Sequence, residues 1–300
     1  MQKLIEEIRK LKKERNAIIL SHNYQLPEVQ DMADYRGDSL ELSRIAAKSD
    51  ARVIVFCGVY FMAETASILS PDKTVIMPDK NAGCPMANMI TAADLRELKD
   101  RHPKAVVVGY VNTSAEVKAE LDICCTSTNA VRVVSNLKDA EEIIFVPDKY
   151  LADFVSKRSG RRLISWDGYC PTHVKILPED IIRSIRLYPK AKVIAHPECT
   201  PEVIALADEA LSTGKTCEYV KQSEAKEFIV ATEVGLAYRL QKDNPGKKFY
   251  PASELAVCPN MKRTNLEKVL WSLEEMKDEV RVPDEIRQKA RKALDAMLSM

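Results

Sequence analysis

The sequence predicts an α/β protein of three similar units, each with a short parallel sheet covered by helices on both faces. Three segments align without a gap: AIILSHNYQLPEVQDMAD from Ala17, AVVVGYVNTSAEVKAELD from Ala105 and AKVIAHPECTPEVIALAD from Ala191. Each begins with an apolar run, passes through a polar turn and continues as a helix pattern. Self-similarity at a fixed period indicates repeated units, and strands that alternate with helices indicate parallel sheets.

The second half of each unit repeats as well. VIVFCGVYFMAE, EIIFVPDKYLAD and EFIVATEVGLAY each predict a buried strand followed by a helix, and TVIMP, RLISW and KKFYP predict a last short strand. We therefore expect three units with boundaries at residues 1–86, 87–172 and 173–264, related by a pseudo-threefold axis. Helices within residues 265–300 are expected to pack back on the body.

Bulk composition excludes several functions. The 300 residues carry 45 basic and 44 acidic side chains, a net charge of +1 that offers no strong field to nucleic acid or an anionic membrane. The start, MQKLIEEIRKLKKERN, mixes acids with bases and predicts an amphipathic helix, not a targeting peptide. No apolar run is long enough to cross a bilayer. We expect a cytoplasmic protein without a nucleic-acid or membrane partner.

Cysteine is unusually frequent for a cytoplasmic chain, with eight residues. Disulfides are disfavoured there, which leaves metal ligation, catalysis or plain burial. Three of the eight, Cys84, Cys170 and Cys258, recur at the repeat spacing of 86 and 88 residues, and each precedes a proline. A threefold arrangement would bring three thiolates to one point, where they suit zinc or an iron–sulfur cluster. The others are expected to be buried small hydrophobes: Cys57, Cys124, Cys125, Cys199 and Cys217.

Polar residues follow the first predicted strand of every unit. Functional groups in open parallel sheets gather at the carboxyl ends of strands, so we expect these residues around the same axis. They are His22 and Tyr24, then Tyr110 and Asn112, then His196 and Glu198. Hydroxyl-rich segments follow in each unit, with Ser39, Ser127, Ser212 and Thr213. The alternatives are satisfied core histidines, half-buried tyrosines and hydroxyls that only cap helices.

These motifs resemble the quinolinate synthase family over nearly the whole chain. The segments that carry the resemblance are SHNYQLPEVQDMADYRGDSLELSRIA, FMAETASIL, CPMANM, YVNTSAEVKAELDICCTSTNAV, FVPDKYLADFV, GYCPTH, HPEC, LSTGK and VCPNMK. The resemblance implies three Rossmann-like domains around an oxygen-sensitive [4Fe–4S] cluster held by Cys84, Cys170 and Cys258. It also implies a transferase of the EC 2.5.1 class in NAD biosynthesis. This enzyme condenses iminoaspartate with dihydroxyacetone phosphate to quinolinate, with release of phosphate and two waters, and the open iron acts as a Lewis acid.

The resemblance also implies residue roles. Acid–base and substrate-contacting roles fall on Tyr24, Tyr110, His22, His196 and Glu198. Binding of carboxylates or phosphate falls on Asn112, Ser39, Ser127, Ser212 and Thr213. Two segments depart from the family pattern: T-S-A-N-A appears here with Thr128 in place of alanine, and G-S-T appears as Leu211-Ser212-Thr213. The second cysteine lies in GYCPTH where the family more often has a G-H-C form. These changes retain the hydroxyls of Ser127, Ser212 and Thr213 and the thiol of Cys170.

Other functions remain open from the residues alone. One alternative is a cluster-dependent hydro-lyase that acts on a small hydroxy acid and needs no triose phosphate. Another is a non-enzymatic protein whose three thiolates hold structural zinc, although no fourth ligand recurs with the repeat. If the family function holds, iminoaspartate must come from an aspartate oxidase or dehydrogenase, which could contact this chain transiently.

Overall fold

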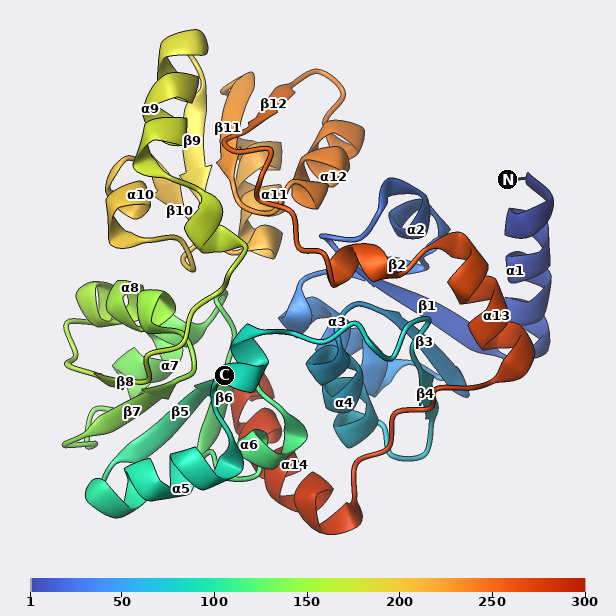
Figure 1. The fold of residues 1–300 in the computed structure, drawn as a ribbon, viewed down its shortest axis with the longest axis horizontal. Helices are drawn as coiled ribbons and strands as arrows, with labels where there is room; N and C mark the ends of the chain where they lie inside the picture. The colour runs from blue at the N-terminus through green and yellow to red at the C-terminus, as the bar shows by residue number, and fades with distance from the viewer. Residues whose placement is uncertain (1, 300) are drawn as a thin grey trace.

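Three four-stranded parallel sheets form the framework of the computed structural model, which describes residues 2–299 (Figure 1). The strand orders are β2-β1-β3-β4, β6-β5-β7-β8 and β10-β9-β11-β12, so the first strand of each unit lies between the second and the third. All pairs within the sheets are parallel. This repeated topology confirms the predicted α/β class with three similar units.

The first unit shows why its apolar runs form strands. Strand β3 is buried at every position, which explains the continuous run VIVFC of a strand covered on both faces. Asp38 caps α3 through a capping box with Glu41. The strands are β1 (Ala17–His22), β2 (Tyr35–Gly37), β3 (Val53–Cys57) and β4 (Thr74–Ile76); the helices are α1 (Gln2–Glu14), α2 (Pro27–Met32), α3 (Ser39–Lys48), α4 (Tyr60–Leu69) and the 3-10 helix η1 (Met86–Met89).

The second unit repeats this order. Thr91 and Asp148 cap its longer helices, α5 and α8, by accepting hydrogen bonds from backbone N–H groups of the first turn. The strands are β5 (Val106–Tyr110), β6 (Ile123–Cys125), β7 (Ile143–Val146) and β8 (Ile164–Ser165); the helices are α5 (Ala92–Arg101), α6 (Ala115–Lys118), α7 (Ala130–Asn136), α8 (Lys149–Ser159) and η2 (His173–Lys175).

The third unit follows the same plan. Pro201 occupies the first position of α10, as Pro27 does in α2. Proline is favourable there because an N–H at this position has no partner within the helix. The strands are β9 (Lys192–Ala195), β10 (Glu209–Ala210), β11 (Glu227–Ala231) and β12 (Lys248–Pro251); the helices are α9 (Pro178–Leu187), α10 (Pro201–Ala205), α11 (Thr213–Gln222), α12 (Gly235–Asp243) and η3 (Met261–Arg263).

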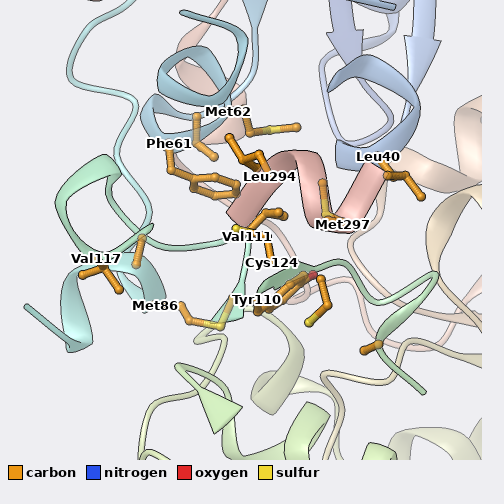
Figure 2. Packing of buried hydrophobic residues seen from close by; sticks show 14 of the residues in the cluster. Leu40, Phe61, Met62, Met86, Tyr110, Val111, Val117, Cys124, Leu294 and Met297 are labelled. Atoms are coloured by element: carbon orange, nitrogen blue, oxygen red, sulfur yellow. The ribbon is translucent and has the colours of Figure 1, made fainter. Parts of the chain in front are cut away.

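Two C-terminal helices pack against the earlier units. Helix α13 (Leu266–Glu275) lies along α1, and α14 (Asp284–Leu298) contacts α4 of the first unit together with α6 and β6 of the second (Figure 1). Leu294 and Met297 of α14 are fully buried in the core that also holds Phe61 and Val111 (Figure 2). We propose the three sheet units as domains, with boundaries near residues 86, 172 and 264. No helix within residues 2–299 combines the length and apolar character needed to cross a bilayer.

Candidate functional site

A cavity of about 180 Å³ lies where the three units meet. Its walls come from the carboxyl ends of β1, β5 and β9 and from the loops that follow β4, β8 and β12. Twelve of the residues singled out from the sequence line it: His22, Tyr24, Ser39, Cys84, Tyr110, Asn112, Ser127, Cys170, His196, Glu198, Thr213 and Cys258. The remaining one, Ser212, is absent from the lining. Segments far apart in the sequence therefore build one enclosed site.

The three repeat-related cysteines share one local structure. Each partly buried Cys84, Cys170 and Cys258 stands shortly before a 3-10 helix, and its sulfur accepts hydrogen bonds from the backbone N–H groups two and three residues later. Burial raises the pKa of all three thiols, that of Cys84 to about 12, and neighbouring cysteines add to the effect for Cys84 and Cys170. Thiolates at this place need a positive partner, which a bound metal centre supplies.

His22 and His196 occupy equivalent positions and make the same local hydrogen bond. Nδ1 of His22 accepts from the backbone N–H of Tyr24 at 3.2 Å, and Nδ1 of His196 accepts from that of Glu198 at 3.3 Å. Burial is the main reason that the pKa of each imidazole falls to about 3, so both rings are neutral near pH 7. With Nδ1 accepting, Nε2 carries the proton, and that of His196 lies 3.4 Å from Ser127 Oγ.

Glu198 is a hydrogen-bonding centre of the cavity. Its Oε1 accepts from the Tyr110 hydroxyl at 2.5 Å, and its Oε2 lies 2.8 Å from Nδ1 of His173. Burial alone would raise the pKa of Glu198, but the neighbouring His173 and His196 imidazoles, with hydrogen bonds from His173 and Tyr110, lower it below its usual range. Burial and the Glu198 charge raise the pKa of Tyr110, which therefore stays protonated. The pair places a carboxylate against a hydroxyl that keeps its proton.

His173 is a site residue that sequence reasoning missed. Its Nε2 lies 2.8 Å from Thr232 Oγ1, which lies 2.6 Å from the Tyr24 hydroxyl. On its other side, Nδ1 lies 3.1 Å from the Cys170 sulfur, and the ring stacks on His196 at 4.6 Å between centroids. The repeat could not indicate His173, because the equivalent positions hold Ala87 and Met261. The available signal in the sequence was that His173 follows the candidate ligand Cys170 by three residues.

Cys170, His173 and Glu198 also form a compact group of possible metal ligands. One ligand atom from each lies within 4.8 Å of the others. Sulfur, imidazole and carboxylate donors together suit a single divalent cation such as zinc. Two candidate ligand sets thus share Cys170: the three repeat-related cysteines and this mixed group.

Glu233 is a second residue missing from the sequence-based set. It is fully buried, lines the cavity, and its Oε1 accepts the backbone N–H of Cys258 at 3.1 Å. Lys262 neutralises it at 2.9 Å and also donates to the carbonyl oxygen of Tyr24. This buried ion pair holds the third cysteine loop against the first unit.

Hydroxyls and one amide line another part of the cavity. Ser39 and Thr213 begin helices α3 and α11, whose first turns are capped by Asp38 and Ser212. Asn112 Oδ1 is buried and has no hydrogen-bond partner among the described residues, so it is available to a ligand donor. Ser212 lies just behind Thr213, where it caps α11 by accepting from Lys215 N at 3.3 Å. Its contact with a substrate stays a prediction.

Acidification is expected to destabilise the fold through these histidines. His22 titrates near pH 6.5 in the unfolded chain but at about 3 in the folded one. Above pH 6.5 both states hold it neutral. As the pH falls from 6.5 towards 3, the unfolded state takes up the proton first, and stability is lost. The thermal unfolding midpoint should drop between pH 7.5 and pH 5.5, and the drop should shrink in His22→Gln. His102 is partly buried but lies outside the cavity lining, so it provides the control: His102→Gln should keep the full drop.

Comparisons with known proteins agree over nearly the full length. A family model described as "Quinolinate synthetase A protein" matches residues 6–299. A quinolinate synthase of Dehalococcoides mccartyi (strain CBDB1) is 61% identical over 292 residues, which cover 97% of this chain and 96% of the relative. Quinolinate synthase 1 of Methanosarcina acetivorans is 54% identical over 297 residues, 99% of this chain and 97% of the relative. A quinolinate synthase of Geobacter metallireducens is 55% identical over 295 residues, 98% and 97% respectively.

Proposed function

The chain belongs to the quinolinate synthetase A protein family, and from this membership we propose that it condenses iminoaspartate with dihydroxyacetone phosphate to form quinolinate. The reaction would release phosphate and two waters and serve de novo NAD biosynthesis in the cytoplasm. One observation carries the proposal. Three cysteines related by the repeat line the same cavity as the buried Tyr110–Glu198 pair.

The residues of the cavity suit a [4Fe–4S] cluster. Cys84, Cys170 and Cys258 would hold three of its irons, because each thiol faces the cavity from a different unit. Three protein thiolates leave one iron without a protein ligand. When bound, the cluster would supply a Lewis acid that polarises substrate oxygen or nitrogen.

The chain itself would supply proton transfer. A dehydration needs one group that removes a proton from carbon and another that protonates the departing hydroxyl. Burial raises the pKa of Tyr24, so its hydroxyl keeps a proton to donate. Thr232 and His173 link this hydroxyl to the Glu198 carboxylate, which would take the proton removed from carbon and pass it along this chain to the Tyr24 oxygen. Tyr110 holds the opposite oxygen of Glu198 and faces the same cavity.

Anionic substrate groups would bind at the hydroxyl end of the cavity. Ser39, Ser127 and Thr213 offer O–H donors from the cavity wall. The Nε2–H groups of the neutral His22 and His196 are further donors that carry no charge of their own. Asn112 Oδ1 would accept from a substrate N–H or O–H.

An anaerobic assay tests the proposed function directly. The purified chain, reconstituted with iron and sulfide, should form quinolinate from iminoaspartate and dihydroxyacetone phosphate and release phosphate. The same chain without reconstitution should form much less. A cluster-loaded chain that forms no quinolinate would refute the proposal. Turnover of a small hydroxy acid without phosphate release would favour the hydro-lyase.

A single metal ion on Cys170, His173 and Glu198 is the second candidate for the centre. A zinc protein would be colourless and hold one metal per chain. A four-iron protein would be brown and hold about four irons. Metal analysis of an anaerobic preparation separates the two directly.

Tyr24→Phe is expected to keep the metal centre and lose turnover. The variant removes only the hydroxyl that hydrogen-bonds to Thr232 at 2.6 Å. General acid–base groups typically contribute about 100- to 10,000-fold, so kcat should fall by roughly 100-fold or more at unchanged iron content. Tyr188→Phe is the matched control, because Tyr188 stacks on Tyr250 away from the cavity lining. Full anaerobic activity in Tyr24→Phe would remove Tyr24 from the mechanism.

A further inference from the structure

Three polar side chains, one from each unit, join at the wall of the cavity, which Asp38 itself lines. Thr128 Oγ1 lies 2.9 Å from Asp38 Oδ2 and 2.8 Å from Ser212 Oγ. Asp38 comes from the first unit, Thr128 from the second and Ser212 from the third. Asp38 and Ser212 are almost fully buried, with 7% and 2% of their surface exposed. We call this set the hydroxyl clasp.

The direction of each hydrogen bond in the hydroxyl clasp follows from its members. A carboxylate only accepts, so the Thr128 hydroxyl donates to Asp38. That bond uses the only proton of the Thr128 hydroxyl. In the bond between Thr128 and Ser212, the Ser212 hydroxyl must therefore be the donor and the Thr128 oxygen the acceptor. Ser212 in turn accepts from the backbone N–H of Lys215, and Asp38 Oδ1 accepts from the N–H groups of Leu40 and Glu41. The hydroxyl clasp therefore ties the first turns of α3 and α11 through one threonine.

Each member of the hydroxyl clasp is the sequence neighbour of a hydroxyl that lines the cavity. Asp38 precedes Ser39, Thr128 follows Ser127, and Ser212 precedes Thr213. The units also approach closely here, because a Cβ added at Gly214 would lie 2.7 Å from Asp38 Oδ2. A shift of any unit would therefore move a cavity hydroxyl relative to the other two.

We propose that Thr128 is a positioning residue: by joining Asp38 to Ser212 it fixes the spacing of Ser39, Ser127 and Thr213 around one anionic group of the substrate. This role rests on the proposed function. Thr128 does not itself line the cavity, so it acts through its neighbours. The threonine that replaces alanine in the T-S-A-N-A segment thus positions the substrate-binding hydroxyls and takes no part in proton transfer.

The test compares Thr128→Val with Thr128→Ser in the cluster-loaded chain under anaerobic conditions. Valine keeps the shape of threonine without its hydroxyl, whereas serine keeps the hydroxyl. The KM for each substrate is measured with the other saturating, together with kcat. Losing a hydrogen bond to a charged group should raise at least one KM by about tenfold in Thr128→Val, with kcat within about twofold. Thr128→Ser should restore the wild-type KM.

Amide hydrogen exchange tests the hydroxyl clasp without depending on enzyme activity. The first-turn amides of Leu40, Glu41 and Lys215 should exchange faster in Thr128→Val and at the wild-type rate in Thr128→Ser. Thr91→Val is the structural control, because exposed Thr91 caps α5 away from the cavity lining. It should change neither KM nor these amides.

Three results would overturn the positioning role. The first is an unchanged KM for both substrates in Thr128→Val. The second is a fall in kcat and thermal stability of Thr128→Val without any change in KM. The third is a Thr128→Ser variant as defective as Thr128→Val. If the wild-type chain makes no quinolinate, the proposed function fails. The exchange rates then still decide whether Thr128 joins the units, and unchanged rates would reject the hydroxyl clasp as well.

Discussion

Replacing Cys170 by alanine is expected to abolish the proposed iron–sulfur centre and, with it, turnover. Cys170 is the one residue shared by the three-thiolate set and the mixed metal-ligand group, so its loss removes a ligand under either assignment. Without the Lewis acid, we expect quinolinate formation to fall by at least about 1,000-fold. Iron content and the broad visible absorption of an anaerobic preparation check the result.

The control for this variant is Cys217→Ala. Cys217 is also partly buried, but it lies outside the cavity lining. Its replacement should leave iron content and turnover close to wild type. Full iron content in Cys170→Ala would overturn the ligand assignment. Loss of iron in Cys84→Ala and Cys258→Ala as well would favour three thiolates over the mixed group, which contains neither.

Glu198→Gln is expected to retain the centre and lose turnover by about 100- to 10,000-fold. Glutamine has nearly the same shape, but it lacks the charge that accepts from Tyr110 and pairs with His173. The buried Tyr110 hydroxyl and His173 imidazole would lose their anionic partner, and the link from Tyr24 could no longer return a proton. Anaerobic kcat at equal iron content is the measurement.

A nearby exposed glutamate supplies the comparison. Glu202 lies in the first turn of α10, so Glu202→Gln should leave kcat unchanged. Turnover of Glu198→Gln close to wild type would exclude Glu198 from proton transfer. Loss of the metal together with turnover would instead indicate that Glu198 is a ligand, as the mixed group allows.

The repeat made much of this architecture predictable. Apolar runs at equal spacing predicted the central strands of all three sheets, because a strand buried on both faces has to be apolar throughout. The same spacing brought out Cys84, Cys170 and Cys258, since equivalent positions in related units lie at equivalent places. His22 and His196 show the same equivalence in detail, because Nδ1 of each accepts a hydrogen bond from the backbone N–H two residues later.

Residues that break the repeat were harder to find. His173 has no polar equivalent in the other units. Glu233 was missed because its partners, Cys258 and Lys262, follow it by more than twenty residues in the sequence. Ser212 resembles a cavity hydroxyl in sequence, but the start of α11 turns Thr213 into the cavity lining and leaves Ser212 behind it. Sequence spacing cannot separate two adjacent hydroxyls, because the helix start decides which one faces inward.

The edge strands β2, β6 and β10 and the helices α3, α7 and α11 emerged only from the structure. The sequence by itself predicted the three units, the other three strands of each unit, and the three thiols that recur with them. These follow from local periodicity, which is written along the chain. Only the tertiary structure decided which side chains meet across units: Glu198 with Tyr110 and His173, Thr128 with Asp38 and Ser212, and α14 with α4 and α6. Such contacts depend on how the units dock, and docking is set by the summed packing of many surfaces, not by any single segment.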